Sequence, residues 1–505
     1  MATRNRLPTM TTIRHAPPRA GAMLEALRGM GYSTGAAIAD ILDNSVAAGA
    51  TCVDIEFSWD GAASRVAILD DGRGMDDAEL ESAMTLGDKS PLDSRDPGDL
   101  GRFGMGLKTA SFSQCRRLTV ASAKNGSHTC LRWDLDELAQ NPEIGWALLE
   151  GPAPGSEAFV TKMLDRSHGS LVLWESMDRI VTKAFSLEHF LDLVDEVEQH
   201  LAMVFHRLIE GTRPKLRLTI NSRPIIAWDP FMSGHPAKPW ESPIARMPTD
   251  AGMITVQCHV LPHKDRLSSD EFKRDGGPAG WSAQQGFYVY RNERLLVAGG
   301  WLGLGQGRAW NREEAYRLAR IRLDIPNTAD AAWKIDIRKS TARPPVSLRS
   351  WLTKLAEDTR ERARRVFAFR AAPQSRSGSP SIDLAWRAEH TKAGVKYRID
   401  EKHPAVAAVL DACGGNLELV RAMLRVIEET VPVQRIWLDT AEAKDTPRGG
   451  FSGEPSAEVL HVLSVLFRDM VIRKNMSEEL ARATLSNTEP FQEYAALIAT
   501  LKHQI

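Results

Sequence analysis

The chain has 505 residues, which is too long for one compact core and suggests roughly three domains. Hydrophobic residues make up 43% and charged residues 26%, the balance of an ordinary globular protein rather than a disordered one. The net charge of -1 gives no overall field that would hold a polyanion, so any nucleic-acid contact must use a local basic patch.

The sequence also disfavours a membrane or secreted location, a zinc site and a disulfide framework. No run approaches the ~18 consecutive apolar residues of a membrane helix, and the polar N-terminus lacks the apolar stretch of a signal peptide. The five cysteines are scattered and include no CxxC pair, so neither a zinc site nor a disulfide framework is indicated. We therefore expect a cytoplasmic protein that does not contact a membrane.

The N-terminal part of the chain reads as mixed helices and short strands. After a polar arm at 1–19, apolar spacing predicts a helix over 20–30, and Ser33 or Thr34 can cap a second helix that runs to about Ala48. Strands are predicted at 51–57, 65–70, 117–123, 129–135 and 170–174. A long amphipathic helix over 185–210 would close a first domain that spans 20–210. This mixture predicts an α+β fold, with helices on one face of a mixed sheet.

The rest of the chain, from residue 211, divides into segments of different composition. Residues 211–345 are strand-rich and α/β in character, and 346–370 form a charged helix. The Ser, Gly and Pro of 371–381 predict a linker, and 382–505 are mostly helical by pattern, apart from one strand candidate at 395–400. The sequence thus predicts an α+β first domain, an α/β second domain and a mostly helical C-terminal domain.

The first chemistry-bearing motif is ADILDNSVAAGA at 39–50. Asp40 and Asn44 are four residues apart and project from the same face of a helix, with Asp43 between them. A carboxylate there can orient and deprotonate an attacking water, and an Asn amide oxygen can ligate Mg²⁺. A solvated helix face that happens to carry Asp and Asn explains the motif equally well on its own.

The second motif, LDDGRGM at 69–75, follows a predicted strand directly. Its two glycines allow a sharp turn beside a ligand, and Asp70 at the strand end can accept a hydrogen bond from an adenine amino group. An ordinary Asp-Gly turn between two elements is the more frequent explanation of such a segment.

The third motif, LGRFGMGLKTASFSQC at 100–115, places three glycines ahead of a helical run. Backbone N–H groups at a helix start, with the added charge of Lys108, suit phosphate binding. The polar segment before it predicts a mobile lid over about 85–106, or alternatively a plain surface loop. In a fourth motif, at 168–180, Ser170 opens a strand and can bond adenine directly or through water.

Together ADILDN, DDGRGM and GRFGMG resemble the conserved boxes of the GHKL ATPases, which include DNA gyrase, MutL, Hsp-class chaperones and sensor histidine kinases. The combination of GYSTGAAIADILDNS with GRFGMGLKTASFSQC is most similar to MORC proteins, especially their prokaryotic relatives. The resemblance implies a Bergerat-type two-layer α/β sandwich that binds ATP with Mg²⁺, with Asn44 as the metal ligand and Asp70 on adenine. The candidate nucleotide-binding residues are Asn44, Asp43, Asp70, Gly72, Gly74, Met75, Lys89, Gly101, Arg102, Phe103, Gly104, Met105, Gly106, Leu107, Lys108 and Ser170.

Beyond residue 180 the resemblance is weaker. Residues 286–296 and 333–345 look like the transducer domain of MutL and MORC proteins, in which a loop lysine reaches the γ-phosphate. Lys339 is the first candidate for that lysine and Lys334 the second; a solvated basic strand end is an equally good interpretation. The family usually has Glu where this chain has Asp40, and the shorter carboxylate lies roughly 1.5 Å further from its water. Hydrolysis is then expected to be slow.

Three functions follow from this interpretation. The first is an ATPase whose nucleotide closes the lid and joins two chains into a homodimeric clamp, acting on DNA or with other proteins in genome maintenance or defence against phage. The second is a nucleotide-gated scaffold with negligible turnover. The third, a histidine kinase, is disfavoured because fewer than 40 residues precede Asp40 and His15 has a Pro-rich setting. The basic segment 360–370 can cradle DNA, although a helix packed on a neighbouring domain explains it better.

Overall fold

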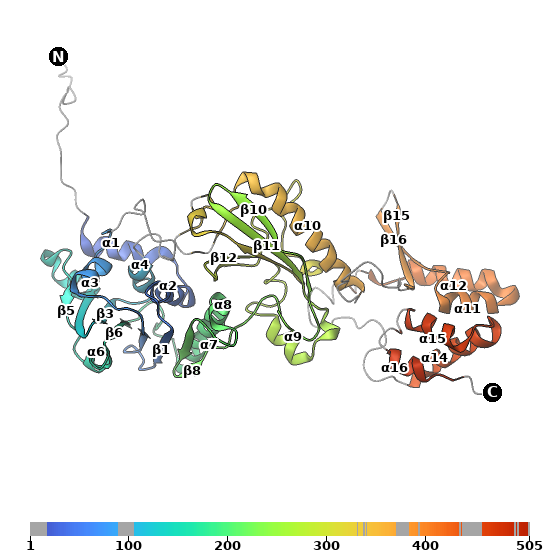
Figure 1. The fold of residues 1–505 in the computed structure, drawn as a ribbon, viewed down its shortest axis with the longest axis horizontal. Coiled ribbons are helices and arrows are strands. Elements are labelled where there is room, and N and C mark those ends of the chain that lie inside the picture. Colours follow the sequence, from blue (N-terminus) through green and yellow to red (C-terminus); the bar gives the residue numbers. More distant parts are fainter. Residues whose placement is uncertain are drawn as a thin grey trace, which may run out of the picture. The chain divides into compact units, whose positions relative to one another are not determined.

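A computed structural model of the protein describes residues 18–88, 106–330, 332–336, 339, 341–369, 383–391, 394–433, 436, 457–488, 491 and 494–502. The chain forms two compact units, Met1–Gln374 and Ser375–Ile505 (Figure 1). Within the described ranges, no helix combines the length and the apolar character needed to cross a membrane.

Short helices dominate the first part of the first unit. They are α1 (Ala20–Leu27), α2 (Thr34–Ala47), α3 (Asp77–Met84), α4 (Gly106–Phe112), α5 (Leu135–Gln140), α6 (Glu157–Leu164), α7 (Leu187–Val204) and α8 (His206–Ile209). The sequence specifies their starts locally. The Ser33 hydroxyl accepts a hydrogen bond from the Ala36 N–H at the start of α2, and a capping box between Asp76 and Glu79 begins α3. The helix predicted from Ser33 or Thr34 to about Ala48 is confirmed.

The first sheet has eight strands in the order β5-β4-β3-β6-β2-β1-β7-β8. They are β1 (Cys52–Ser58), β2 (Arg65–Asp70), β3 (Arg117–Lys124), β4 (Ser127–Asp134), β5 (Leu149–Glu150), β6 (His168–Glu175), β7 (Arg217–Ile220) and β8 (Arg223–Pro224). All five strands predicted here are present. The sheet also runs past residue 210, where the sequence places the end of the first domain, because β7 pairs in parallel with β1.

The sheet is covered unequally on its two faces. Along β3, Leu118 and Val120 face a large core that includes α2, α4 and α7, whereas Ala121 and Ala123 face a smaller core with residues of α6. This alternation is the two-residue period of a strand that is buried on both sides. The sequence predicts helices on one face of the sheet only. This prediction is incomplete, because α6 packs on the opposite face.

The single long helix predicted over 185–210 is wrong. Helix α7 ends at Val204, and Phe205 has φ -106° and ψ 11°, outside the helical range. The break buries the Phe205 ring completely and lets the following His206 ring bond the Tyr290 hydroxyl at 2.7 Å. Tertiary packing overrides helix periodicity at this point.

A second sheet, of six strands, follows in the same unit. Its order is β10-β11-β14-β12-β13, with β9 paired to β11. The strands are β9 (Trp240–Glu241), β10 (Ala245–Thr249), β11 (Gly252–Val260), β12 (Gly286–Arg291), β13 (Arg294–Ala298) and β14 (Ala319–Asp324). Two helices accompany them, α9 (Ser269–Asp275) and α10 (Val346–Phe369).

Strand β12 connects this sheet to the first part of the unit. Phe287 and Val289 lie in the core that α10 covers, while Tyr288 and Tyr290 lie with Met203 of α7 in a separate cluster. Aromatic side chains on alternate positions thus bury both faces of β12. This packing carries β13 and the loop before α10 toward α2.

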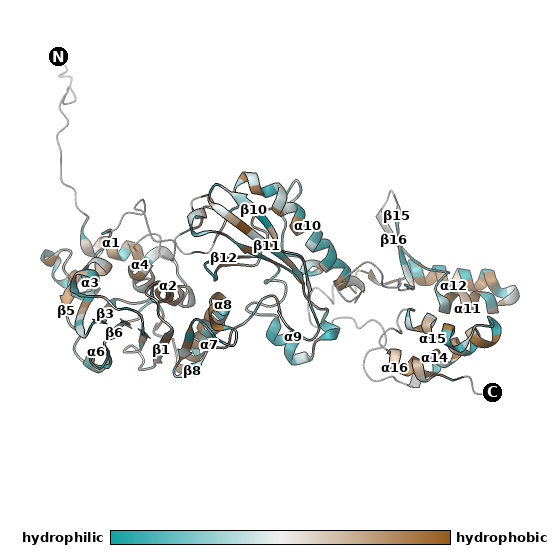
Figure 2. Ribbon diagram, viewed as in Figure 1, coloured by the Kyte–Doolittle hydropathy of each residue, from teal (hydrophilic) through white to brown (hydrophobic). Residues whose placement is uncertain are grey.

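The basic end of α10 packs on the segment that connects β13 to β14. The Arg360 guanidinium lies 3.7 Å from the ring centre of Tyr316 and 4.6 Å from those of Trp301 and Trp310, and burial lowers its pKa. Figure 2 shows hydrophobic and hydrophilic residues interspersed along the first half of α10 and a mainly hydrophilic stretch in its second half. These contacts favour the packed-helix interpretation of 360–370 over a nucleic-acid cradle.

The second unit is small and mainly helical. Its elements are β15 (Trp386–Thr391), β16 (Gly394–Ile399), α11 (Pro404–Ala412), α12 (Leu417–Glu429), α14 (Ala457–Arg468), α15 (Glu478–Ser486) and α16 (Ala495–Thr500). The strand candidate at 395–400 is real, but it pairs with β15 in an antiparallel hairpin that the sequence analysis missed.

Candidate functional site

Helix α2 carries three polar side chains with very different exposure. Asp40 and Asp43 are 4% and 1% exposed, whereas Asn44 is exposed. The spacing of four residues places Asp40 and Asn44 on one side of the helix. A pair of buried carboxylates requires compensation by cations or hydrogen-bond donors.

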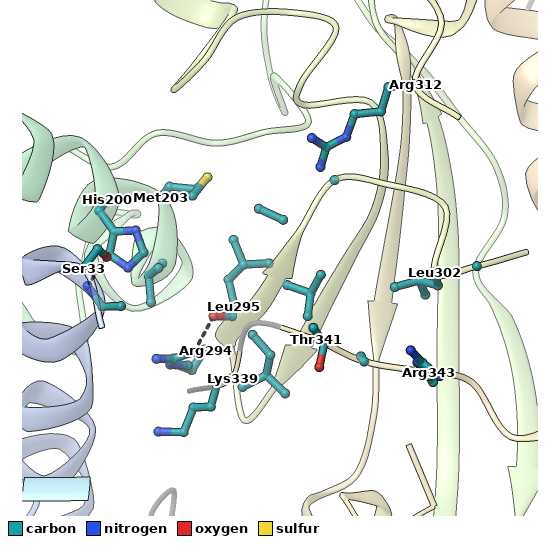
Figure 3. A pocket seen from close by; sticks show the side chains of 18 of the residues that line it. Ser33, His200, Met203, Arg294, Leu295, Leu302, Arg312, Lys339, Thr341 and Arg343 are labelled. Atoms are coloured by element: carbon teal, nitrogen blue, oxygen red, sulfur yellow. Dashed lines mark hydrogen bonds between the residues drawn. The ribbon is translucent and has the colours of Figure 1, made fainter. Parts of the chain in front are cut away.

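Two cations from the second sheet region supply that compensation. The Lys339 ammonium lies 2.8 Å from a carboxylate oxygen of Asp40 and 2.5 Å from one of Asp43. The Arg294 guanidinium, at the start of β13, lies 3.1 Å from Asp43 and 3.7 Å from Asp40. Figure 3 shows Arg294 and Lys339 extending side by side toward α2. The four groups form a neutral cluster, which we call the α2 ion cluster.

The electrostatics of the α2 ion cluster follow from this geometry. Burial acts to raise the pKa of the Asp43 carboxyl, but Arg294 and Lys339 outweigh it and hold that pKa below its ordinary value. On the other side of Asp40, the Tyr32 hydroxyl donates a hydrogen bond of 3.0 Å to the carboxylate. Burial, followed by the charge of Asp40, raises the pKa of Tyr32, so Tyr32 acts only as a neutral donor.

A second buried carboxylate lies at the end of β2. Asp70 is 7% exposed and accepts three hydrogen bonds, from the Ser45 hydroxyl at 2.8 Å and from the N–H groups of Gly72 at 2.9 Å and Ser170 at 3.1 Å. Burial raises the pKa of Asp70 in spite of these donors. The donors fix the carboxylate in one orientation at the strand end.

Ser170 belongs to a small hydroxyl network beside Asp70. Its hydroxyl lies 3.0 Å from that of Ser122, which donates to the Gly169 carbonyl and accepts from the Met75 N–H at 2.9 Å. The glycine turn at 72–75 is therefore tied to β3 and β6. Asp71 anchors its other side by accepting hydrogen bonds from the N–H groups of Thr51 and Cys52.

Gly74 is required at its place in this turn. Its φ is +70°, and a Cβ there would lie 1.7 Å from the Ala123 carbonyl oxygen. At Gly72 a Cβ would approach the Ala48 side chain to 3.0 Å, so α2 also passes close to the turn. The close approach of three backbones explains the glycines without reference to a ligand.

We predict that Gly74→Ala lowers the free energy of unfolding by about 3 kcal/mol, because it combines a left-handed φ with a backbone clash. Gly126→Ala is the matched control, since Gly126 has φ +78° and open space around its Cβ position. That control is expected to cost about 1 kcal/mol from backbone strain alone. Urea unfolding of both variants measures the difference, and equal losses would contradict the clash.

Helix α4 contains the last described part of the glycine-loop motif. Gly106 begins it and Leu107 is half-buried. The Lys108 ammonium is buried and donates hydrogen bonds to the carbonyls of Ala83 at 2.8 Å and Thr85 at 2.9 Å, near the end of α3. In this structure Lys108 therefore stabilises the end of α3.

Some candidates lie elsewhere. Lys334 is exposed, so of the two lysine candidates it is Lys339 that the structure brings to Asp40. The candidates outside the described residues are Lys89, Gly101, Arg102, Phe103, Gly104 and Met105, with most of the expected lid.

Sequence reasoning missed Arg294, Tyr32, Ser45 and Ser122. Arg294 follows the hairpin turn at Asn292 and Glu293, both with positive φ, and is separated by 251 residues from its partner Asp43. The segment RNER indicates a hairpin turn, but the sequence does not show how close this turn lies to α2. Ser45 lies next to Asn44 and was overlooked because a lone serine in a helix carries no signal.

Two comparisons bear on this site. Residues 32–169 match the family model described as "Histidine kinase-, DNA gyrase B-, and HSP90-like ATPase". The chain is also 28% identical over 184 residues to the DNA mismatch repair protein MutL of Rhodospirillum rubrum, an alignment that covers 36% of this chain. The chain spans 28% of that relative's length. The matched residues 32–169 include α2, the glycine turn and α4.

Proposed function

Because residues 32–169 form a GHKL-type ATPase domain in a chain distantly homologous to MutL, we propose that the protein binds ATP with Mg²⁺ and hydrolyses it. The observation that carries the proposal is the placement of polar side chains along α2 and at the end of β2. A buried, oriented carboxylate at Asp70 suits the adenine end of the nucleotide, and Asp40 with the neighbouring exposed Asn44 suits the phosphate end.

At the adenine end, Asp70 accepts a hydrogen bond from the adenine amino group, and Ser170 supports the same edge. The Asp70 side chain is oriented by Ser45, Gly72 and Ser170 before any ligand arrives. Pre-oriented acceptors lose less free energy to ordering when a base binds. Gly72, Gly74 and Met75 let the backbone turn beside the base.

At the phosphate end, Asn44 is free to present its amide oxygen to magnesium, which suits the preference of that ion for oxygen ligands. Bound Mg²⁺ supplies neutralisation of the phosphate charge. Asp40 takes a proton from water while the water oxygen bonds the γ-phosphorus and the bond to the β,γ-bridging oxygen breaks, so that ADP and phosphate leave.

The α2 ion cluster sets a condition on this reaction. While Lys339 and Arg294 are paired with Asp40, its carboxylate oxygens are occupied by these two cations rather than by an attacking water. The γ-phosphate of ATP competes with Asp40 for Lys339, and this exchange would connect the second sheet to the nucleotide. Lys334, which is exposed, does not enter this exchange.

The same observation favours a second function, a nucleotide-gated scaffold with little turnover. If Lys339 remained on Asp40 when ATP was bound, the nucleotide would change the conformation without being hydrolysed. Under either function we propose that ATP joins two chains into a clamp. The relative's name, a DNA mismatch repair protein, suggests DNA as the object of that clamp, in genome maintenance or anti-phage defence.

Calorimetry with ATP and Mg²⁺, together with phosphate release by the full chain, tests the proposal. We expect adenine nucleotide to bind only weakly without Mg²⁺, and a slow, steady release of phosphate with it. Sizing with a non-hydrolysable ATP analogue should double the mass. No uptake of ATP would remove the proposed function, whereas uptake without phosphate release would leave the scaffold.

A further inference from the structure

A cavity of about 730 Å³ opens beside the α2 ion cluster (Figure 3). One wall comes from the start of α2 and from α7, at Ser33, His200 and Met203. The opposite wall comes from β13 and from the segment that leads into α10. Its volume lies within the roughly 300–1,000 Å³ that small-molecule sites occupy.

The cavity is lined by one sign of charge. Five of its lining residues are cations, Arg294, Arg312, Lys339, Arg343 and Arg349, and no Asp or Glu is among the lining residues that the structure describes. Asp40 and Asp43 compensate only Arg294 and Lys339 among these cations. Clustered positive charge in a concave surface attracts and holds anions.

The other three arginines have no carboxylate partner among the described residues. The ion pairs formed there include none of Arg312, Arg343 or Arg349, and Arg349 donates only a 3.4 Å hydrogen bond to the Pro344 carbonyl. The Arg312 guanidinium extends over Gly300, where a Cβ would lie 3.6 Å from it. Figure 3 shows Arg312 and Arg343 on the side of the cavity away from α2.

The remaining lining is neutral or apolar. Burial, and then the charge of Arg294, lowers the pKa of His200 to about 4, so at neutral pH His200 offers hydrogen bonds rather than charge. Val297, Ala298 and Leu302, which are partly exposed, supply an apolar surface in the same cavity. A ligand that fits this lining has an anionic end and a less polar body.

We propose that this cavity binds a small phosphate-bearing molecule of nucleotide size, separate from the ATP that the proposed function places at Asp70. Arginine is suited to this ligand because its planar guanidinium donates two parallel hydrogen bonds to phosphate oxygens. Arg312 and Arg343 supply the positive charge and guanidinium donors that attract the phosphate, and the partly exposed Val297 and Leu302 contact the body. The inference does not depend on ATP hydrolysis.

Calorimetric titration of the full chain with uridine monophosphate tests the proposal, both without and with a saturating non-hydrolysable ATP analogue and Mg²⁺. We expect binding in both conditions. Arg312→Ala/Arg343→Ala should weaken it by at least about tenfold, because two charge-assisted contacts are lost. The control Arg246→Ala/Arg266→Ala removes the same charge from exposed positions outside the cavity and should change affinity by less than about twofold.

Several outcomes would overturn the proposal. They are equal affinity in all three chains, no binding at millimolar concentration, and loss of binding when the ATP analogue is added, which would place the ligand in the ATP site. Failure of the analogue itself to bind would count against the proposed ATPase only. If inorganic phosphate binds as tightly as uridine monophosphate, the ligand does not use the apolar surface. If a single-stranded DNA oligomer displaces uridine monophosphate at lower concentrations, the cavity is assigned to nucleic acid instead.

Discussion

Asp40→Asn should reduce steady ATP hydrolysis by about 100-fold or more, because removing a general base typically costs a factor of 10² to 10⁴. ATP binding should persist, since Asp70 and Asn44 are unchanged. The substitution is nearly isosteric, and Lys339 keeps its second partner Asp43, so the fold should survive. Phosphate release under saturating Mg-ATP measures the effect.

The matched control is Asp250→Asn, which removes one carboxylate from an exposed turn between β10 and β11. This variant should hydrolyse ATP at the rate of the wild type. If wild type releases phosphate no faster than Asp40→Asn, the enzyme interpretation fails and the scaffold takes its place. That result would mean that Lys339 and Arg294 hold Asp40 throughout the nucleotide cycle.

Asn44→Ala should weaken magnesium-dependent ATP binding by about 100-fold, because loss of even an indirect metal contact commonly costs 10- to 100-fold. Asn44 is exposed on α2, and alanine favours helix, so the melting temperature should stay the same or rise slightly. Calorimetry with and without Mg²⁺ separates the two contributions.

Titrations without Mg²⁺ serve as the internal control for this variant. There, wild type and Asn44→Ala should bind ATP equally weakly, since the amide acts through the metal. A large difference without Mg²⁺ would show that Asn44 contacts the nucleotide directly, and an unchanged affinity with Mg²⁺ would remove it from the metal site.

Local features of the sequence predicted much of the first sheet. Its main strands were recognisable because their apolar residues recur within short runs bounded by turns, and α2 because Ser33 caps an apolar helical pattern. The break at Phe205 and the hairpin partner β15 were not recognisable, because each depends on contacts made outside its own segment. Periodicity reports which face is apolar, not where packing interrupts a helix.

The candidate site divides in the same way. By itself the sequence determined a GHKL-type ATPase domain, because its motifs are contiguous and their order is read directly from the chain. Only the tertiary structure decided that Arg294 and Lys339 meet Asp40 and Asp43, and that three further arginines share one cavity. The reason is physical: ion pairs across some 250 to 300 residues depend on how two sheets pack through β12, and no short-range pattern encodes that packing.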